Sequence, residues 1–486
     1  MTDPFDFLFD RSQGHIRIPI WGHIPLDRKV RKLIGHPHFF RLRGIKQLSF
    51  VEYVFPGATH SRFEHSLGVW YLTTVIFQNL VKNPVNQNSD AARACLIPEN
   101  IRTLQAAALL HDLGHYPHAH LLESQSFSPS DPEGFLHHQV LARDIMKEKT
   151  DGESIEDILT NEWQVNPERV FAIITGDKSA EPLGKIVSGI LDPDKMDYLI
   201  RDAHHCAVPY ASVDIWRLIE SFVLDSERNR LSVSPKGIAS FESLMFSKYM
   251  MTRHIYWHHT VKTMGTMLKR LIQDLLDEGS LKPGDLKQIF YESNDEQVLS
   301  SIQQLTSGSS AGFLTLLDQI IKRRPYKKLL TIGFSRGTHE ADQIAVPDGV
   351  MDHRSERFGK VPATDDPVIR RLNNLNLDPV ARKEMEAHLA RVIMKRTGLQ
   401  VEPFEVLLDL PGFHTIFEYR DLDELRIWNP QTGVFDPFVG TPLTVFQPDW
   451  ISRLETSARQ IQILVHPRLA GLRNQNWSFL REELFR

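Results

Sequence analysis

The sequence predicts a mainly α-helical protein with a smaller α+β region toward its C-terminus. Much of the first half shows apolar residues at helical spacing, in segments that have Pro or Gly at their ends. After about residue 280, turn-rich stretches such as "TSGSSAG" and "NPQTGVFDPFVG" accompany two short runs, "FEVLLDL" and "QIQILVHP", that are typical of strands. We therefore expect an N-terminal segment over residues 1–50, a helical core over 51–280 and an α+β region over 281–486.

Composition and charge exclude several classes of protein. Hydrophobic residues make up 41% and charged residues 24% of the 486 residues, which are ordinary globular values. The net charge of -5 lacks the basic excess of a duplex-binding protein, and it does not support single-stranded nucleic acid as a partner. With Cys95 and Cys206 as its two cysteines, the chain has no disulfide framework and no CxxC zinc site. The chain has neither a signal-like start nor an apolar run of about 18 residues, so we expect a cytoplasmic protein without membrane contact.

The N-terminal segment carries a basic amphipathic stretch. Residues 26–51 hold seven Lys or Arg residues set among apolar ones. Such a stretch is either a solvated helix face or a surface for an anion or another subunit.

The next predicted helix begins at Ser61. Ser61 and Glu64 have the spacing of a capping box, and the apolar residues that follow recur at helical intervals. Arg62 and His65 then share one face of this helix.

A second helix, "IRTLQAAALLHD", is apolar on almost all sides and is therefore predicted to be buried. Gly114 and Pro117 end it. His111 and Asp112 consequently sit at a buried helix end.

Two further helices complete the predicted core. In "GILDPDKMDYLIRDAHH", Asp192 is the N-cap with Pro at the first helical position, and Asp194, Tyr198 and Asp202 follow in one stripe. Residues 241–278 form a long amphipathic helix that ends at Gly279.

Histidines gather in the predicted core. Ten of the 22 fall between His60 and His205. A buried imidazole beside a buried carboxylate, as at His111 and Asp112, must compensate the desolvation of both, and a divalent cation does so directly. The neighbouring helices offer His65 and Asp194 as further ligands. Two imidazoles and two carboxylates suit a six-coordinate ion such as Mn, Mg or Fe, with zinc not excluded.

Three motifs together resemble a known family. "RFEHSLGV", "HDLGH" and "DPDKMDYLIRDAHH" are similar to the signatures of HD-domain phosphohydrolases, in the branch of the deoxynucleoside triphosphate (dNTP) triphosphohydrolases. The resemblance covers roughly residues 22–262 and implies an HD-domain helical core. It implies metal ligation by His65, His111, Asp112 and Asp194, and a catalytic role for His115, Glu123 and His137.

The same resemblance implies a set of substrate contacts. The family's phosphate-binding positions fall on Arg62, Lys195 and Arg253, and its sugar-binding positions on Gln47, Leu48, Tyr198 and Asp202, with His120 beside both groups. Arg and Lys are the side chains that phosphate groups require.

Three functions follow from these observations. The first is a metal-dependent hydrolase that cleaves a dNTP into deoxynucleoside and inorganic triphosphate, assembled as a homo-dimer or homo-tetramer as the resemblance implies. The second is an HD-family phosphodiesterase, nucleotidase or nuclease, because "SFVEY" and Val261 replace glycines and an aromatic residue of the family near the presumed base pocket. The third is a non-catalytic nucleotide sensor.

Overall fold

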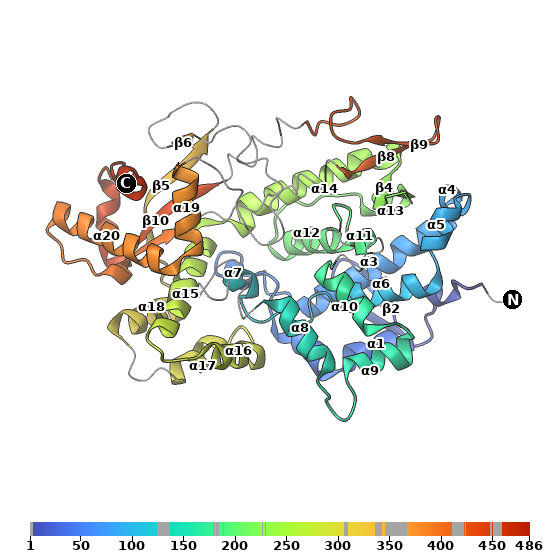
Figure 1. Cartoon of the computed structure of the whole chain (residues 1–486), viewed down its shortest axis with the longest axis horizontal. Helices are drawn as coiled ribbons and strands as arrows, with labels where there is room; N and C mark the ends of the chain where they lie inside the picture. Colours follow the sequence, from blue (N-terminus) through green and yellow to red (C-terminus); the bar gives the residue numbers. More distant parts are fainter. Residues whose placement is uncertain are drawn as a thin grey trace.

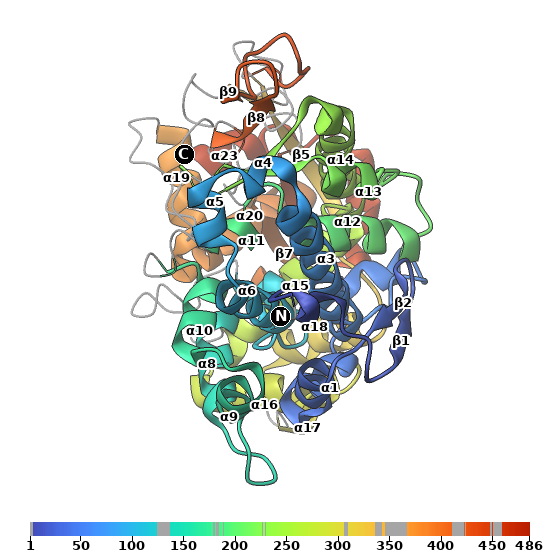
Figure 2. The ribbon, with the colours of Figure 1, turned by 90° about the vertical axis from the view of Figure 1, so that its right-hand side faces the viewer.

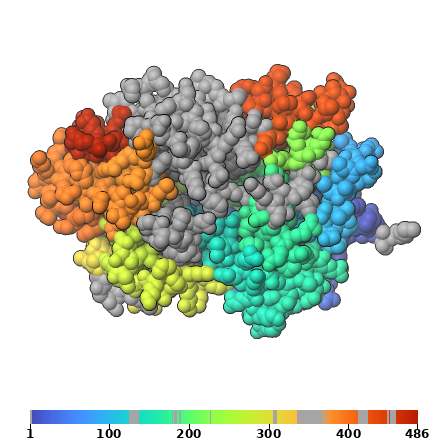
Figure 3. All heavy atoms as spheres, viewed as in Figure 1, coloured from blue at the N-terminus to red at the C-terminus, as the bar shows by residue number. Residues whose placement is uncertain are grey.

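The fold class is the predicted one, a mainly helical protein with small sheets. The computed structural model describes residues 3–123, 137–177, 180, 184–187, 189–225, 227–228, 230–305, 310–335, 343–345, 367–410, 422, 424–447, 450 and 459–486. Figure 1 shows helices through most of this chain, with α19 (Pro367–Leu377) and α20 (Pro379–Thr397) at one end and strands β8 (Arg426–Asn429) and β9 (Val434–Pro437) away from them. Figure 3 shows the same view with all atoms.

The helical part comprises α1 (Arg28–Gly35), α2 (Pro37–Phe40), α3 (Arg62–Lys82), α4 (Pro84–Gln87), α5 (Asp90–Cys95), α6 (Pro98–Leu110), α7 (Ala119–Glu123), α8 (His138–Lys147), α9 (Ile155–Ile158), α10 (Pro167–Thr175), α11 (Gly184–Val187), α12 (Pro193–His205), α13 (Ile215–Glu220), α14 (Ile238–Met251) and α15 (His259–Asp277). It continues with α16 (Pro283–Glu292), α17 (Val298–Leu305) and α18 (Ala311–Ile321). Helices α19 (Pro367–Leu377), α20 (Pro379–Thr397) and α23 (Leu480–Phe485) belong to the C-terminal part.

Helices α3 and α12, which carry the motifs "RFEHSLGV" and "DPDKMDYLIRDAHH", start where the sequence predicts. The Ser61 hydroxyl accepts a hydrogen bond from the Glu64 amide at 3.4 Å, and the Asp192 carboxylate accepts one from the Lys195 amide at 2.7 Å. Each satisfies an amide that the first turn of a helix leaves unpaired. Helix α3 packs against both α6 and α12 (Figure 2), so three polar helix ends meet inside an apolar core.

The long helix predicted over residues 241–278 is wrong, because the structure has two helices there. A π-helical turn, Thr252–Tyr256, follows α14. In this turn the Trp257 amide donates a hydrogen bond to the Thr252 carbonyl at 2.8 Å. His258 leaves helical geometry and caps α15 by accepting from the Thr260 amide at 3.3 Å. Histidine is a weak capping signal, so the break had no sequence marker. The predicted end holds, since Gly279 follows α15 with a φ of +67°.

Three sheets lie within the described residues. Strands β1 (His15–Ile18) and β2 (Gly22–Pro25) form an antiparallel hairpin. A second sheet has the order β3-β4-β8-β9, from Phe222–Asp225, Arg230–Val233, Arg426–Asn429 and Val434–Pro437. A third has the order β6-β5-β10-β7, from Gln343–Ala345, Lys327–Ser335, Gln460–Val465 and Val406–Asp409.

The two predicted strands are confirmed as β7 and β10. They pair antiparallel with Ile463 opposite Leu408, and both residues lie in a second hydrophobic core together with α20. The first core contains the helices around α3 and also Ile427 and Phe438 from the late β8–β9 segment. Residues far apart in the chain therefore close one core around the candidate site.

The basic N-terminal stretch is largely paired within the protein. Lys32 contacts Glu153 at 2.6 Å and Glu162 at 3.2 Å, and Arg28 contacts Glu162 at 3.3 Å. Among the described helices, none is both long and apolar enough to cross a membrane.

Candidate metal and nucleotide site

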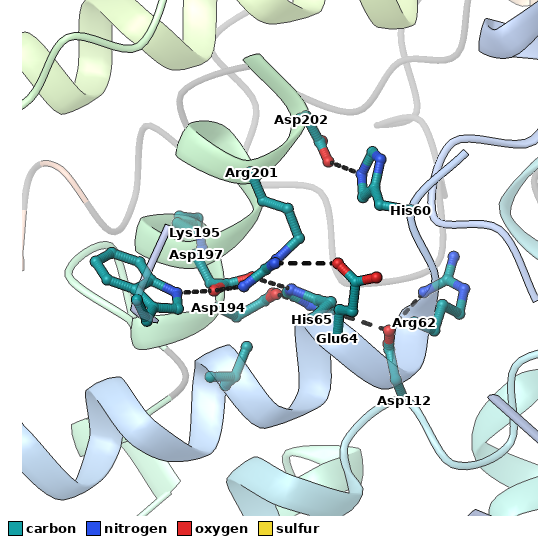
Figure 4. A network of polar contacts seen from close by, with 12 residues as sticks. His60, Arg62, Glu64, His65, Asp112, Asp194, Lys195, Asp197, Arg201 and Asp202 are labelled. Carbon is teal, nitrogen blue, oxygen red and sulfur yellow. Dashed lines mark hydrogen bonds and ion pairs between the residues drawn. The ribbon is translucent and has the colours of Figure 1, made fainter. Parts of the chain in front are cut away.

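Three helix ends bring the predicted metal ligands together (Figure 4). His65 lies in the first turn of α3, His111 and Asp112 directly follow α6, and Asp194 is the second residue of α12. His65 Nε2 lies 2.9 Å from Asp194 Oδ1 and 3.2 Å from His111 Nε2. One possible ligand atom from each of His65, His111 and Asp194 lies within 4.8 Å of the others. Asp112 lies beside this group, with Oδ1 3.5 Å from His111 Nε2.

The donor set fits a cation. His65 Nδ1 donates to the Asp197 carboxylate at 2.8 Å, and His111 Nδ1 donates to the Ala108 carbonyl at 2.8 Å. Each Nδ1 therefore carries a proton, so each Nε2 is the ring nitrogen that would present a lone pair to a cation in place of its own proton. The two lone pairs and the Asp194 carboxylate face the same point, where a positive charge is needed to hold them together.

The same electrostatics act on the protonation of these groups. Although burial opposes it, the carboxylates of Asp194 and Asp197 raise the pKa of His65 to about 10. Burial likewise opposes ionisation of Asp112, yet the Arg62 guanidinium at 2.7 Å helps to hold the pKa of this carboxyl well below its usual range. The site therefore keeps its carboxylates charged, as metal ligation requires.

A second cluster lies next to the first and contains His115, Glu123 and His138. The His138 ring stacks on the His115 ring at 4.1 Å, and His138 Nδ1 lies 2.9 Å from Glu123 Oε1. Burial, together with Arg62 and the neighbouring imidazoles, holds the pKa of His115 well below 6.5. Both ring nitrogens of His115 are buried and find no hydrogen-bond partner in the part of the chain that the structure describes, and Nδ1 lies 3.2 Å from Asp112 Oδ1. His115 is thus a neutral imidazole in the lining of the cavity.

His137 occupies a different position from His138. Its Nδ1 accepts a hydrogen bond from the Gln139 amide at 3.3 Å and so caps α8. The structure brings His138, and not His137, against His115 and Glu123. The family resemblance assigned the catalytic role to His137 and gave none to His138.

A cavity of about 490 Å³ connects the two clusters. Its lining includes the four predicted metal ligands, seven further residues that the sequence reasoning singled out and two residues of the π-helical turn. These are Gln47, Leu48, Arg62, His65, His111, Asp112, His115, His120, Asp194, Tyr198, Asp202, Thr252 and Tyr256. An apolar wall is made by Val69, Ala107, Ala108, Ile173 and Ile174. The volume is that of an ordinary small-molecule site.

Lys195 and Arg253 are outside this lining. The Lys195 ammonium donates to Asp192 Oδ2 at 2.7 Å and to the Gly189 carbonyl at 3.1 Å. Arg253 is exposed and donates to the hydroxyl of Tyr249. The structure therefore does not bring these two predicted phosphate ligands to the cavity.

The Asp202 carboxylate is held at the cavity by two neighbours. The Tyr256 hydroxyl donates to Oδ2 at 2.6 Å, and His60 Nε2 lies 2.8 Å from Oδ1. The side-chain amide oxygen of Gln47, Oε1, is buried and has no hydrogen-bond partner within the described residues. Both groups offer acceptors to a ligand hydroxyl or amino group.

Sequence reasoning missed several residues of this site. Asp197 stands three residues after Asp194 on the same helix, a spacing that places them on neighbouring faces. Arg41 donates from Nη2 to the carbonyls of Leu113 and His115, at 3.1 and 2.6 Å, and so holds the turn after Asp112. No sequence signal marks Arg41, because its partners are backbone atoms distant in the chain.

Comparisons with known proteins agree with this geometry. An HD-domain family model matches residues 62–174, and an HD-associated region matches residues 213–353. The chain is 30% identical to an uncharacterized protein of Methanocaldococcus jannaschii over 66% of this chain and 60% of that protein. It is 30% identical to the deoxynucleoside triphosphate triphosphohydrolase SAMHD1 of Homo sapiens over 52% of this chain and 43% of that protein. The chain thus spans less than two thirds of either relative.

Two solved structures share the fold. A phosphohydrolase from Bacteroides thetaiotaomicron superposes with a TM-score of 0.62 at 20% identity, covering 93% of this chain and 100% of that one. A hypothetical protein from Aquifex aeolicus superposes with a TM-score of 0.60 at 22% identity, covering 97% of this chain and 99% of that one. At these identities the likeness concerns the fold alone.

Proposed function

We propose that this chain, an HD-domain protein of the phosphohydrolase superfamily, is a metal-dependent triphosphohydrolase that converts a dNTP into deoxynucleoside and inorganic triphosphate. The observation that carries the proposal is the meeting of two imidazole lone pairs and the Asp194 carboxylate beside Arg62 and the neutral His115. The relatedness to a deoxynucleoside triphosphate triphosphohydrolase supports the choice of substrate.

His65, His111, Asp112 and Asp194 would hold the divalent ion, which we expect to be Mn, Mg or Fe. When bound, such an ion supplies an activated water and polarises a phosphoryl oxygen. Arg62 is placed to bind a phosphate, since its Nη1 already contacts Asp112 and its Nε is buried with no partner among the described residues. A buried guanidinium with a free donor is a strong phosphate ligand.

The neighbouring histidines move the proton. Hydrolysis at the α-phosphorus releases a proton from the attacking water and requires one on the departing 5′ oxygen. His115 lines this wall of the cavity and neither of its ring nitrogens has a hydrogen-bond partner within the described residues. The negative charge of a bound phosphate would favour its protonation by the released proton, which it would then pass to the 5′ oxygen. The Glu123 carboxylate fixes His138, and the stacked His138 ring fixes His115. General acid or base assistance of this kind contributes about 10²–10⁴-fold to a rate. Asp202, Tyr198 and Gln47 provide acceptors for the sugar.

One observation favours a second candidate, an HD-family phosphodiesterase or nucleotidase. Among the described residues that line the cavity, Arg62 is the single Lys or Arg. The negative charge of a triphosphate exceeds the positive charge of one guanidinium and one divalent ion, whereas the negative charge of a monophosphate or a phosphodiester does not.

Homo-oligomeric assembly is part of the main proposal because the family resemblance implies it. Light scattering of the purified protein tests it.

The test is a product analysis. Purified protein with Mn or Mg is incubated separately with each dNTP, each rNTP, each dNMP and a single-stranded oligonucleotide, and the products are resolved by chromatography. Deoxynucleoside together with intact triphosphate is the expected result, and it disappears in Asp112→Ala. Release of phosphate, pyrophosphate or monophosphates supports the second candidate instead. Nucleotide binding without turnover by the metal-loaded protein would contradict both and indicate a sensor.

A further inference from the structure

The Asp197 carboxylate lies behind the metal ligand His65, on the side away from the cavity. Figure 4 shows Asp197 on α12 facing His65 on α3, with Arg201 beside it. The Asp197 side chain is 0% exposed, and its Oδ2 accepts from His65 Nδ1 at 2.8 Å. Asp197 is not part of the predicted ligand set, yet it contacts the ligand directly.

Four donors fill the acceptor positions of this carboxylate. Oδ2 accepts from His65 Nδ1 and from Arg201 Nε, each at 2.8 Å. Oδ1 accepts from Arg201 Nη2 at 2.8 Å and from the indole Nε1 of Trp21. A carboxylate offers about four acceptor positions, so none is left for water.

Trp21 comes from a distant part of the chain. It stands in the turn of the β1–β2 hairpin, 176 residues before Asp197. Its ring also meets the Trp216 ring edge-on at 5.9 Å between centroids. The N-terminal hairpin thus reaches the interior of the metal site through one hydrogen bond.

We propose that Asp197 is the positioning residue that sets His65 for its cation, and that Trp21 fixes Asp197 so that the N-terminal hairpin forms part of the metal site. The proposal deepens the function above and rests on its metal dependence. Metal-ligating histidines commonly donate their other ring nitrogen to a carboxylate, which fixes the tautomer and the ring orientation. In this chain the Asp197 carboxylate holds a proton on His65 Nδ1, so Nε2 is the ring nitrogen that faces the cation position.

The packing around Asp197 shows that its position is closely defined. A Cβ atom added to Gly68 of α3 would lie 1.9 Å from Asp197 Oδ1 and 2.7 Å from Arg201 Nη2. Only a glycine lets α3 approach the ion pair this closely. Burial opposes ionisation, but Arg201 holds the pKa of the Asp197 carboxyl well below its usual range. The close contacts with Gly68 and Arg201 therefore fix the position of the carboxylate.

A purely structural role for the Asp197–Arg201 pair predicts a different outcome. In that case the pair would hold α12 together, and the indole of Trp21 would contribute packing without affecting the cation. The two roles separate when cation affinity is measured together with the stability of the metal-free protein. Trp216 offers a matched control, because it is a tryptophan in contact with Trp21 and is 48% exposed.

The experiment titrates Mn²⁺ into the full-length, metal-stripped protein by calorimetry. We expect Asp197→Asn to lower the affinity for Mn²⁺ by about 10–100-fold, the usual range for loss of such a partner, and Trp21→Phe to lower it by about tenfold. Trp216→Phe should bind as the wild type does. Trp21→Phe keeps an aromatic ring in place but removes one donor from the buried Asp197 carboxylate, so its metal-free form should remain folded and unfold at a somewhat lower temperature than Trp216→Phe.

The possible results are distinct. Wild-type affinity in Trp21→Phe overturns the role of the hairpin, and wild-type affinity in a folded Asp197→Asn overturns the proposal as a whole. If the wild type itself binds no Mn²⁺, Mg²⁺ or Fe²⁺, the proposed function fails together with it. Mn²⁺ binding with the expected losses but hydrolysis of another nucleotide leaves the positioning role intact and refutes only the substrate.

Discussion

Replacement of Gly68 by alanine tests the contact between α3 and α12. The added Cβ would meet Asp197 Oδ1 at 1.9 Å and Asp197 Cγ at 2.6 Å, both far inside van der Waals contact. Neither atom can retreat cheaply, because Asp197 and Arg201 are 0% exposed and paired through two bonds of 2.8 Å. Either α3 moves away from α12 or the ion pair opens.

The size of the effect follows from these two routes. Overpacking a core costs about 1–3 kcal/mol, and opening a buried ion pair costs about 3–5 kcal/mol. We therefore expect Gly68→Ala to lower the free energy of unfolding by about 3 kcal/mol. We also expect a lower affinity for Mn²⁺, because His65 turns with its partner Asp197.

Urea unfolding of the metal-free protein, followed by Mn²⁺ titration, measures both quantities. The control is Gly284→Ala in α16, where an added Cβ would meet nothing within 4 Å. That substitution should be neutral or slightly stabilising, since alanine is the better helix former by about 0.5–1 kcal/mol. A Gly68→Ala protein as stable as Gly284→Ala would refute the close approach of the two helices.

Three further predictions concern the surroundings of the site. His138→Ala should lower turnover by about 10²–10⁴-fold at unchanged Mn²⁺ affinity. His137→Ala removes the cap of α8 and a ring stacked on His138 at 5.0 Å, and should cost about 1 kcal/mol of stability with a smaller loss of turnover; comparable rates in the two variants would contradict this. Arg41→Ala removes a charged donor from two backbone carbonyls of the turn after Asp112 and should cost about 2–3 kcal/mol in urea unfolding, with turnover reduced. Burial raises the pKa of Asp295 from 3.8 to about 7, so its contribution to stability is present below about pH 4 and is lost as the pH rises through about 7. The stability advantage of Asp295→Asn over the wild type should therefore grow between pH 5 and pH 8, and an advantage independent of pH would show that the carboxyl titrates normally.

Local signals predicted the parts of the fold that local physics decides. The caps at Ser61 and Asp192 and the apolar spacing behind them found α3 and α12, because capping and periodicity depend on residues within one or two turns. The strands β7 and β10 were visible for the same reason. The break at Thr252–Tyr256 was not visible, because the residues of a π-helical turn do not differ in type from those of an ordinary helix.

The candidate site divides in the same way. Its histidines and carboxylates could be named from motifs, and the structure brings His65, His111, Asp112 and Asp194 together. The directions of long side chains could not be predicted: Lys195 turns back to its own helix cap, Asp192, and to the Gly189 carbonyl, although the spacing alone equally allows it to face the cavity. Residues that support the predicted ligands from behind, such as Trp21, could not be predicted either. They depend on contacts between distant segments, and residue spacing within one sequence does not indicate such contacts.

The hydrogen bond between Trp21 and Asp197 also has a consequence for biosynthesis. Its two partners are 176 residues apart, so at about 5–20 residues per second the ribosome adds Asp197 roughly 10–35 seconds after Trp21. During that interval the nascent chain holds the hairpin, α3 and α6 but lacks Asp194 as well as Asp197. On the proposed ligand set, a chain arrested before α12 would carry His65, His111 and Asp112 without Asp194, and His65 would lack the carboxylate of Asp197. The complete site can therefore form only after α12 has emerged.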